Sequence, residues 1–575
     1  MWLRVSFSGN STIVAFVAAC ISLLTSPMSG AQSPAAAQSP SARAVGGANC
    51  GDSGPYDVVI VGAGLSGLSA SRELRRLGHK TLILESNDRI GGRGLTAPVG
   101  GVPIDYGGAW LHGVPTNPLV PLADALGFTR KRTQLEAPYF VDDRMASKAE
   151  QEVFDSAYEA YAGSIAQGAA AIGYQAAVAD RFCNVAHEIA ESPATRRVGL
   201  ARAYCSELDA TVTDASLAAR LCAAAERVDN VATASAACAV ESGRIRVASD
   251  DSTVYLPGSA EFQSIMPLLI ENAGALESAA ELNRTSAFDG SQFAAEDDDL
   301  IAEGFGTFVN KIGEREPVCL NSAVSEIRYG KSGVELIAGG ERRSYRAKTT
   351  LVTVSVGVLQ ANRIKFAPAL PAWKQEAIEN LRMGNLQKII MPLSRDIFGD
   401  KIADTSWVVY QGDVFPGGNR GVMAFVLKPM GLNMAIGFFG GDRARAFEAG
   451  CQGVVRGSGP ALACDEPAVS TAVRALTKMF KAPDAILQNQ IHVTRWSIDE
   501  TSMGAYSVPL PGYWDMRETL RKPVGNPSAG EDEDGPKQVF FSGEAATRAI
   551  YNGSFPGAYE TGMQAAREIH AQLLD

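Results

Sequence analysis

In Val58-Val59-Ile60-Val61-Gly62-Ala63-Gly64-Leu65-Ser66-Gly67, a short apolar run leads directly into three glycines with Gly-x-Gly-x-x-Gly spacing. The apolar run predicts a parallel strand covered on both faces, and the residues after Gly67 have the pattern of a helix. Each glycine has its own physical task. Gly62 makes the tight turn, Gly64 lets a pyrophosphate approach the backbone, and Gly67 lets the helix pack closely on the strand. The unpaired N–H groups at the start of the helix favour a phosphate there.

A second apolar strand, Thr81–Leu84, ends at Glu85, whose carboxylate can accept hydrogen bonds from ribose hydroxyls. A Gly-x-Gly-x-x-Gly sequence alone is weak evidence for a nucleotide site. Here it lies between a strand and a helix, and an acidic residue closes the next strand. These features together predict a dinucleotide-binding site.

The following stretch, Asn87–Arg93, indicates which dinucleotide binds. Its paired glycines lie between Arg89 and Arg93, and the Arg93 guanidinium could meet a phosphate or flavin oxygen. The stretch resembles the Arg-x-Gly-Gly-Arg motif of FAD-binding flavoproteins in the glutathione-reductase-like group, which nicotinamide dehydrogenases generally lack. The alternative is an ordinary glycine turn with exposed arginines. The position after the ribose-binding strand favours FAD.

The N-terminal residues have the features of an export signal. Arg4 precedes the apolar segment Ile13–Leu24, which is too short to span a bilayer as a stable helix, and Ser29-Gly30-Ala31 offers a cleavage site. We therefore interpret residues 1–31 as a signal peptide and residues 32–54 as a flexible linker. The protein is expected to be secreted or periplasmic, with no stable membrane span. Val17–Cys20 also resembles a lipoprotein cleavage box, which is the second interpretation because apolar residues continue beyond it.

The chain has 575 residues, 46% of them hydrophobic, which is enough for one large core or two linked ones. Its net charge of −11 becomes −12 when residues 1–31 are removed, because Arg4 is their only charged residue. This charge disfavours nucleic acid as a partner and is compatible with a cationic substrate, although ordinary solubility explains it equally well. The acidic runs Asp297–Asp299 and Glu531–Asp534 are predicted to be solvated loops.

Cysteine usage is consistent with export. Beyond Cys20, the sequence has no Cys-x-x-Cys and no Cys/His cluster at metal spacing, so no zinc or iron–sulfur site is expected. Three pairs are close enough in sequence to suggest disulfides in an oxidising compartment. They are Cys183/Cys205, Cys222/Cys238 and Cys451/Cys464. Connectivity cannot be read from sequence, and buried free thiols are the alternative.

Four further motifs resemble the flavin amine oxidase family, and within it the polyamine oxidases most closely. They are Gly108-Ala109-Trp110-Leu111-His112-Gly113, Val352-Thr353-Val354-Ser355-Val356-Gly357-Val358-Leu359, Phe541-Ser542-Gly543-Glu544-Ala545 and Gly553-Ser554-Phe555-Pro556-Gly557-Ala558-Tyr559. The resemblance covers roughly residues 55–120 and 300–575. It implies an α/β fold with a glutathione-reductase-like, Rossmann-type FAD-binding domain assembled from discontinuous segments, plus an α+β substrate domain. We expect residues 55–115, 300–365 and 491–575 in the FAD-binding domain, and residues 116–299 and 366–490 in the substrate domain.

The resemblance also assigns residues to FAD. They are Gly62, Gly64, Gly67, Glu85, Arg93, Val324, Trp496 and Glu544. Val324 would flank the adenine, Trp496 would lie by the isoalloxazine, and Glu544 would bond near the pyrophosphate or ribityl chain. In monoamine oxidases a cysteine at the position of Ala505 is covalently linked to the flavin, so the alanine implies non-covalent FAD.

Three residues are candidates for the chemistry. Lys388 matches the family lysine that holds a water against flavin N5. A surface lysine on a strand edge is the alternative, but an ammonium in the run Lys388–Met391 is costly to bury unless something needs it. Tyr506 would form one wall of an aromatic cage around the amine, with the facing wall near Ser554, unless it is a core aromatic. His112 would contact a substrate nitrogen, unless backbone groups satisfy it.

The resemblance implies oxidative deamination of a (poly)amine, in which a hydride moves from the α-carbon to flavin N5 and O2 reoxidises the flavin, giving H2O2. An amine dehydrogenase with a periplasmic electron acceptor is one alternative. L-amino-acid oxidases carry a carboxylate-binding arginine in a Gly-Pro-Met-Arg turn, where this chain has Gly107–Trp110. Lys388, Trp496 and Tyr506 together disfavour a non-catalytic FAD-binding protein. The related histone demethylases would need a chromatin partner, which the signal peptide and acidic charge disfavour.

Overall fold

The structure is a computed structural model, and its described residues begin close to the first predicted strand. They are 48, 50–133, 139–156, 158, 182, 185–186, 188–190, 192–211, 215–230, 234, 237, 260–286, 289, 297–455, 457–510, 513–525, 536–547 and 550–574. The predicted signal peptide, residues 32–47 of the predicted linker, Cys183, Cys238 and Glu531–Asp534 lie outside the described residues.

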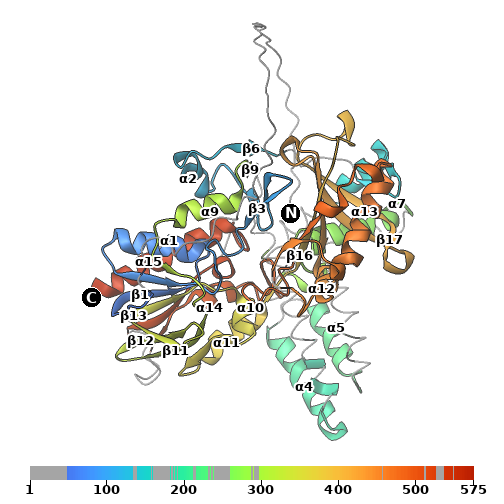
Figure 1. Ribbon diagram of the computed structural model, residues 1–575. Helices are drawn as coiled ribbons and strands as arrows, with labels where there is room; N and C mark the ends of the chain where they lie inside the picture. The colour runs from blue at the N-terminus through green and yellow to red at the C-terminus, as the bar shows by residue number, and fades with distance from the viewer. Residues whose placement is uncertain are drawn as a thin grey trace, which may run out of the picture.

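The glycine motif follows the first strand of a nine-stranded sheet. Strand β1 (Tyr56–Val61) pairs in parallel with β2 (Thr81–Leu84) and β13 (Arg343–Val352), and β13 pairs in parallel with β24 (Lys537–Phe541). Segments from both ends of the chain therefore meet in one sheet (Figure 1). Its other strands are β10 (Val318–Cys319), β11 (Val324–Gly330), β12 (Gly333–Ala338), β14 (Lys365–Ala367) and β23 (Val524–Gly525).

A second large sheet has eight strands in the order β20-β21-β16-β19-β18-β17-β7-β8. These are β7 (Phe140–Val141), β8 (Arg144–Met145), β16 (Leu386–Pro392), β17 (Ser406–Phe415), β18 (Asn419–Leu427), β19 (Met434–Gly440), β20 (Gly459–Pro460) and β21 (His492–Val493). Three small sheets join the two large ones. They contain β5 (Trp110–Leu111), β9 (Asp299–Ile301) and β6 (Arg130–Arg132); β3 (Thr96–Val99) and β4 (Val102–Asp105); and β15 (Leu381–Met383) and β22 (Ser507–Pro509).

All but two of the described helices pack in the cores beside these sheets. The described helices are α1 (Leu65–Arg76), α2 (Leu119–Ala125), α4 (Ala194–Thr211), α5 (Ala215–Ala225), α7 (Ala260–Glu271), α9 (Phe305–Gly313), α10 (Val356–Gln360), α11 (Ala372–Asn380), α12 (Gly441–Ala449), α13 (Glu466–Phe480), α14 (Met516–Arg521) and α15 (Phe555–Leu574). Helices α4 and α5 project away from both large sheets (Figure 1). Among the helices described, none is both long and apolar enough to cross a membrane.

Side chains of β1 alternate between two apolar cores. Val58 and Ile60 pack in the core formed with α1, α9 and α15. Val59 and Val61 pack in the core formed with α10, α11 and α14. The strand is buried on both faces, which explains why its sequence is a continuous apolar run rather than an alternating one.

Strand β16 also has two different faces. Ile389 and Met391 pack toward α13, whereas Ile390 packs in another core, together with residues of α7. Because side chains alternate along a strand, Lys388 lies on the same face as Ile390. This face borders the cavity described below.

Several expected domain edges differ from the strand pairing. Strand β21, expected in the FAD-binding domain, pairs with β16 in the eight-stranded sheet. Helix α11, expected in the substrate domain, packs in a core of the nine-stranded sheet, as does α2. These segments are short, so their sequences do not indicate which sheet they cover.

The disulfides correct the expected pairing. Cys451 and Cys464 are bonded as predicted. Cys205 bonds to Cys222, with 4.9 Å between their Cα atoms, because α4 and α5 lie side by side. The expected pairs Cys183/Cys205 and Cys222/Cys238 are therefore wrong. The bond Cys50–Cys319 was not predicted: it joins the segment before β1 to β10, over a separation of 269 positions.

The acidic run Asp297–Asp299 is not a solvated loop. Asp298 and Asp299 are 6% and 3% exposed, and β9 begins at Asp299. Pairing of β9 with both β5 and β6 buries these carboxylates. The expectation of a solvated loop is therefore wrong for this run.

Candidate active site

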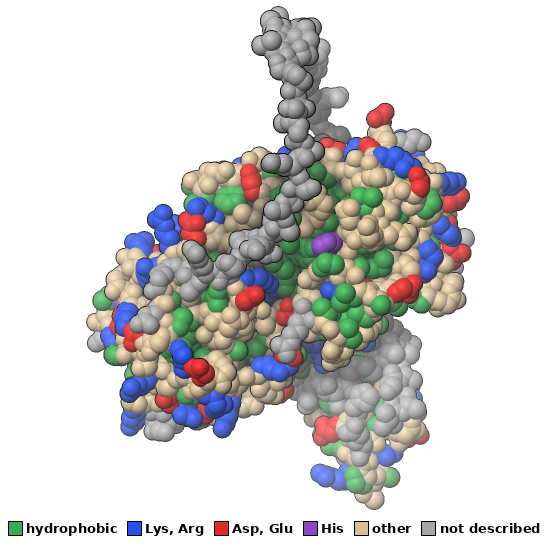
Figure 2. All heavy atoms as spheres, in the orientation of Figure 1, with side chains coloured by type: hydrophobic (Ala, Val, Ile, Leu, Met, Phe, Trp, Pro, Cys, Tyr) green, Lys and Arg blue, Asp and Glu red, His purple; other side chains and the backbone are tan. Residues whose placement is uncertain are grey.

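A cavity of about 360 Å³ is lined by residues of both large sheets and of the segments that join them. In the space-filling view, apolar side chains gather in the hollow at the middle of the molecule (Figure 2). The lining includes the predicted site residues Gly62, Gly64, Glu85, Arg93, His112, Lys388, Trp496, Tyr506 and Glu544. The structure therefore brings together residues from distant parts of the chain.

The glycine end of the cavity fits a pyrophosphate. Helix α1 starts after Gly64 without a side-chain cap and has no acidic residue in its first turn, so no carboxylate of that turn competes for its N–H groups. A Cβ added to Gly64 would meet no protein atom within 4 Å, whereas one added to Gly92 would lie 3.2 Å from the Gly64 Cα. Two glycine turns thus cross closely and leave open space for a ligand. This donor set suits the diphosphate of a dinucleotide.

Glu85, at the end of β2, fixes the glycine turn that follows β1. Its Oε2 accepts the Ala63 N–H at 2.6 Å, and its Oε1 accepts the Asn87 N–H at 2.8 Å. The carboxylate also lines the cavity. It therefore connects the two glycine-containing segments and faces the space where a ribose would lie.

Glu544 lies between two arginines. Its Oε1 is 2.7 Å from Arg93 Nη1, and its Oε2 accepts the Ser507 hydroxyl at 2.5 Å. Burial by itself would raise the pKa of Glu544, but the charges of Arg93 and Arg517 and the Ser507 hydrogen bonds lower it overall. Arg517 is buried and forms a two-contact ion pair with Asp289, at 2.6 and 2.9 Å. Both cavity-lining arginines are thus paired with carboxylates.

Lys388 brings an ammonium to the cavity. Its Nζ donates hydrogen bonds to the backbone carbonyls of Asp105 at 2.9 Å and Gly107 at 2.5 Å. An ammonium has three N–H donors, so one remains for a group in the cavity. Burial lowers the pKa of Lys388 to about 8, while the Asp105 carboxylate acts in the opposite direction. A buried lysine of this kind is frequent at functional sites.

Two interactions hold the segment that carries Trp496. Its indole Nε1 donates to the Tyr106 carbonyl at 3.1 Å. On the next residue, the Ser497 N–H donates to Glu448 Oε2 at 2.6 Å, and burial raises the pKa of Glu448 to about 8. Glu448 Oε1 has no hydrogen-bond partner in the part of the chain that the structure describes. The backbone beside Trp496 is therefore fixed by a buried carboxyl group.

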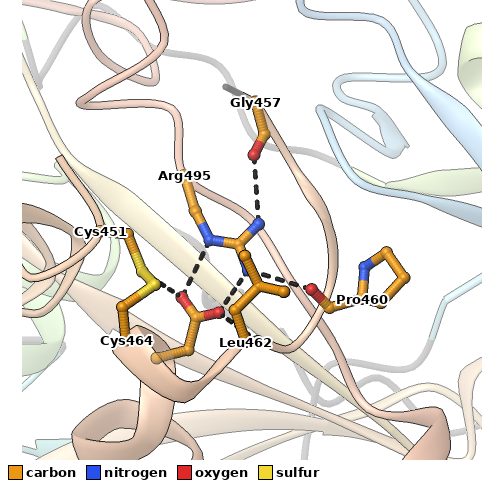
Figure 3. The surroundings of a disulfide bond; sticks show 7 residues. Cys451, Gly457, Pro460, Leu462, Cys464 and Arg495 are labelled. Atoms are coloured by element: carbon orange, nitrogen blue, oxygen red, sulfur yellow. Dashed lines mark hydrogen bonds and ion pairs between the residues drawn. A yellow bond between two sulfur atoms is a disulfide. The ribbon is translucent and has the colours of Figure 1, made fainter. Parts of the chain in front are cut away.

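The Cys451–Cys464 disulfide lies beside the segment that carries Trp496 (Figure 3). Arg495, the residue before Trp496, forms a buried ion pair with Asp465, whose Oδ1 lies 2.9 Å from the guanidinium Nε. Cys451 Sγ lies 3.2 Å from that oxygen. The Cys451–Cys464 bond thus ties the segment after α12 to the short 3-10 turn (Ala463–Asp465) that carries Asp465.

Aromatic side chains form the wall around Lys388. The Tyr506 hydroxyl donates to the Glu277 carbonyl at 2.6 Å, and burial raises the pKa of Tyr506. Trp407 and Phe438 also line the cavity, with ring centroids 5.1 Å apart. Ser554 lines it as well, so part of the expected cage is formed by a hydroxyl-bearing residue and not by a second tyrosine.

Glu277 contributes a carboxylate to this wall. It follows a π-helical turn (Asn272–Leu276) and lines the cavity next to Leu276. Its Oε2 accepts the Tyr158 hydroxyl at 2.7 Å, and its Oε1 accepts the Asn272 amide at 2.6 Å. Two neutral donors therefore stabilise a carboxylate at the edge of the aromatic wall.

His112 lines the cavity immediately after β5. Its carbonyl accepts the Asn117 side-chain amide at 2.7 Å, and its ring lies nearly parallel to that of Trp110, with centroids 6.3 Å apart. Its Nδ1 is 3.3 Å from Asp298 Oδ1. The imidazole therefore borders the cavity between the Trp110 ring and the Asp298 carboxylate.

The family model described as "Flavin containing amine oxidoreductase" matches residues 65–570. The chain belongs to this family. It is an FAD-dependent oxidoreductase that acts on amines, as the glycine turns, the buried lysine and the aromatic wall suggest.

The matches to individual relatives cover nearly the whole of this amine oxidase. Polyamine oxidase 2 of Arabidopsis thaliana is 27% identical over 528 residues, which is 90% of this chain and 89% of that protein. Lysine-specific histone demethylase 1 homolog 1 of the same organism is also 27% identical, over 90% of this chain and 52% of that protein. The solved structure of cyclohexylamine oxidase from Brevibacterium oxydans IH-35A has a TM-score of 0.57 and 20% identity, over 91% of this chain and 100% of that one. This likeness shows a shared FAD-binding α/β fold.

Two predicted residues of the amine oxidase do not line the cavity. A Cβ on Gly67 would lie 2.1 Å from the Gly62 carbonyl oxygen, so Gly67 contributes through packing of helix on strand, as expected. Val324 starts β11 and packs in a core of the nine-stranded sheet. The structure does not bring it into the cavity, and its contact with adenine stays a prediction.

Other cavity residues of the amine oxidase were not predicted. Trp407, Phe438, Glu277 and Arg517 belong to no recognisable motif. Arg517 lies in the charged helix α14, whose sequence resembles an exposed one, yet the side chain is buried. Only the three-dimensional arrangement brings these side chains to the cavity, so no local signal could have indicated them.

Proposed function

We propose that this amine oxidase oxidises a polyamine with O2, releases H2O2 and holds FAD non-covalently. One observation carries the choice of substrate. Both cavity arginines are paired with carboxylates, and Glu277 brings a further carboxylate to the cavity lining. Among the residues described, neither cavity arginine is free to bind a substrate carboxylate. Such a lining suits a substrate with a second positive charge. The names of several relatives, which are polyamine oxidases, support the same substrate class.

The chain's own residues would orient and desolvate the amine. Bound FAD would supply the two-electron acceptor for the hydride lost from the amine α-carbon, and O2 would take up these electrons. Tyr506, Trp407 and Phe438 would enclose the alkyl chain and exclude water, which strengthens the polar contacts inside the cavity. The remaining N–H of Lys388 would hold a water at the centre of the site, and His112 would accept a hydrogen bond from the uncharged amine.

Ala505 supports non-covalent FAD. It lines the cavity, and its carbonyl accepts Arg93 Nη1 at 2.9 Å. An alanine side chain has no sulfur or other nucleophilic atom that could bond to the flavin. The ion pair of Arg93 with Glu544, together with the helix N-terminus, would hold the cofactor by polar contacts alone.

We also propose that the protein is secreted or periplasmic. Three disulfides among the described residues favour an oxidising compartment. The N-terminal apolar segment supports the same location. The parallel strands β10, β2, β1, β13 and β24 favour the glutathione-reductase-like, Rossmann-type assignment of the FAD-binding domain.

A peroxide assay with the purified holoenzyme tests the substrate class. The panel contains spermine, spermidine, putrescine, an aromatic monoamine and L-amino acids. We expect the highest kcat/KM for a polyamine and no turnover of amino acids. Turnover with a dye acceptor but no peroxide in air would indicate a dehydrogenase. Preference for an L-amino acid would contradict the proposal.

A further inference from the structure

Arg517, on α14, joins that helix to three segments that border the cavity. Its side chain is only 2% exposed. Nε and Nη2 donate to the two carboxylate oxygens of Asp289, at 2.6 and 2.9 Å. Nη2 also donates to the Ser507 carbonyl at 3.0 Å, and Nη1 donates to the carbonyls of Glu544 and Ala545 at 3.3 and 3.4 Å. The guanidinium is therefore held in one orientation by partners on several sides.

The contact of Arg517 with the Ser507 hydroxyl fixes the direction of a chain of hydrogen bonds. Nη1 lies 2.7 Å from Ser507 Oγ, and a guanidinium can only donate. The hydroxyl hydrogen is therefore directed to Glu544 Oε2, which lies 2.5 Å from Oγ and, as a carboxylate oxygen, can only accept. Arg517 thus donates to Ser507, and Ser507 donates to Glu544.

Glu544 keeps one acceptor site for a ligand. Its Oε1 accepts Arg93 Nη1 at 2.7 Å, and its Oε2 accepts the Ser507 N–H at 3.2 Å in addition to the hydroxyl. Among the described residues, these donors fill three of the roughly four acceptor sites of a carboxylate. Because both bonds from Ser507 go to Oε2, the remaining site is on Oε1. Glu544 lines the cavity, so a hydroxyl group bound there could use this site.

Arg93 and Arg517 are the charged groups that act on Glu544 in the described chain. Burial alone would raise the pKa of Glu544, but these two guanidinium groups lower it overall. Tyr506, the residue before β22, is neutral because burial raises its pKa. Helix α15, which packs against the same segment, faces it with the uncharged Thr561. Glu544 is therefore ionised at neutral pH and below.

We propose that Arg517 is a positioning residue that directs the Ser507 hydroxyl onto one oxygen of Glu544 and so keeps a site on the other oxygen for a hydroxyl of FAD. The inference rests on the expected contact of Glu544 with FAD and deepens the proposed function by naming the residue that orients this contact. A hydroxyl that donates to a carboxylate forms a strong, charge-assisted hydrogen bond. Arg517 would therefore contribute to FAD affinity without itself binding the cofactor.

Ser507→Ala interrupts the chain and leaves the ion pair of Arg517 with Asp289 in place. The dissociation constant of FAD is measured by diluting the holoenzyme and following the fluorescence of released FAD. We expect the ratio of this constant to the wild-type value to be roughly tenfold at pH 5.5 and smaller at pH 8. Loss of the hydroxyl donor raises the pKa of Glu544, so lowering the pH protonates the carboxylate and weakens its contact with FAD. Arg517→Gln should show the same trend more strongly, because the positive charge is lost as well.

Glu544→Gln gives the decisive readout, because an amide does not titrate in this pH range. If Arg517 and Ser507 act through Glu544, the pH dependence caused by Ser507→Ala disappears in the Ser507→Ala/Glu544→Gln protein. A role in packing alone would not depend on pH or on Glu544. Arg521→Gln is the matched control: Arg521 lies on the same helix, pairs with Glu568 at 3.0 Å and does not line the cavity, so FAD affinity should be unchanged.

Two results would overturn the role of Arg517. Wild-type FAD affinity in Ser507→Ala at both pH values, or a loss that is the same at both, would show that no directed chain of hydrogen bonds acts on Glu544. A pH dependence that persists in the double variant would assign the titration to another group. Wild-type affinity in Glu544→Gln would instead place the failure in the expected contact of Glu544 with FAD, and peroxide release from polyamines by the wild-type enzyme would still support the proposed function.

Discussion

Replacing Lys388 with methionine tests whether burial of the Lys388 ammonium lowers the free energy of unfolding at neutral pH. Burial lowers the pKa of Lys388 from 10.5 to about 8, so the native state disfavours the charged form. The sign follows from linkage. Below the native pKa the lysine is charged in both states and the full penalty is present. As pH rises toward the unfolded pKa, the native lysine has already lost its proton and the penalty disappears.

The magnitude can be worked out from these two pKa values. The penalty is about 3 kcal/mol at pH 7 and about 1 kcal/mol at pH 10. Wild type should therefore gain about 2 kcal/mol of unfolding free energy relative to Lys388→Met between these pH values. Contributions from the hydrogen bonds to Asp105 and Gly107 largely cancel in this difference, because both pH values compare the same two proteins.

The assay is urea unfolding of the FAD-free protein at each pH, followed by tryptophan fluorescence. Lys374→Met is the control: this buried lysine donates to three backbone carbonyls and does not line the cavity. Holoenzyme of Lys388→Met should retain FAD but turn over much more slowly, whereas Lys374→Met should change stability only. A constant stability difference across pH, or wild-type turnover in Lys388→Met, would refute the reasoning.

Two further predictions concern buried groups near the cofactor site. Burial raises the pKa of Glu448 from 4.5 to about 8, so the native state keeps a proton that the unfolded chain releases. Wild type should therefore lose about 3 to 4 kcal/mol of unfolding free energy relative to Glu448→Gln from pH 5 to pH 8. Parallel unfolding curves for the two proteins would disprove this. Gly67→Ala should destabilise the FAD-free protein, since its Cβ would meet the Gly62 oxygen, whereas Gly64→Ala should leave that stability unchanged and weaken FAD binding roughly tenfold. Thermal melting and FAD titration distinguish the two glycines, and equal effects would contradict the assignment.

Much of the expected FAD-binding part of the cavity could be predicted, because the sequence features that indicate it are local. Gly62, Gly64 and Glu85 lie within one strand–helix–strand unit, where the glycine spacing and the acid that closes the second strand are visible in the sequence. Lys388 could be singled out because a charge inside an apolar strand is costly. Its position in the cavity agrees with that reasoning.

The remaining features depend on contacts between distant segments. Asp298 was expected in a solvated loop because an acidic run has no local sign of burial, and the pairing of β5 with β9 provides that burial. Cys319 lies on β10, at the edge of the sheet beside β2, and Cys50 reaches it from the segment before β1. Trp407 reaches the cavity through the register of the eight-stranded sheet. None of these placements follows from residue type or short spacing.

Anaerobic mixing of the purified FAD-containing protein with spermidine tests the central claim most directly. The account predicts that the visible flavin absorbance bleaches in a single turnover and that admitting air restores it with release of one H2O2 per flavin. The same protein should remain coloured with L-amino acids. A flavin that stays fully oxidised with spermidine and every other amine would contradict the account.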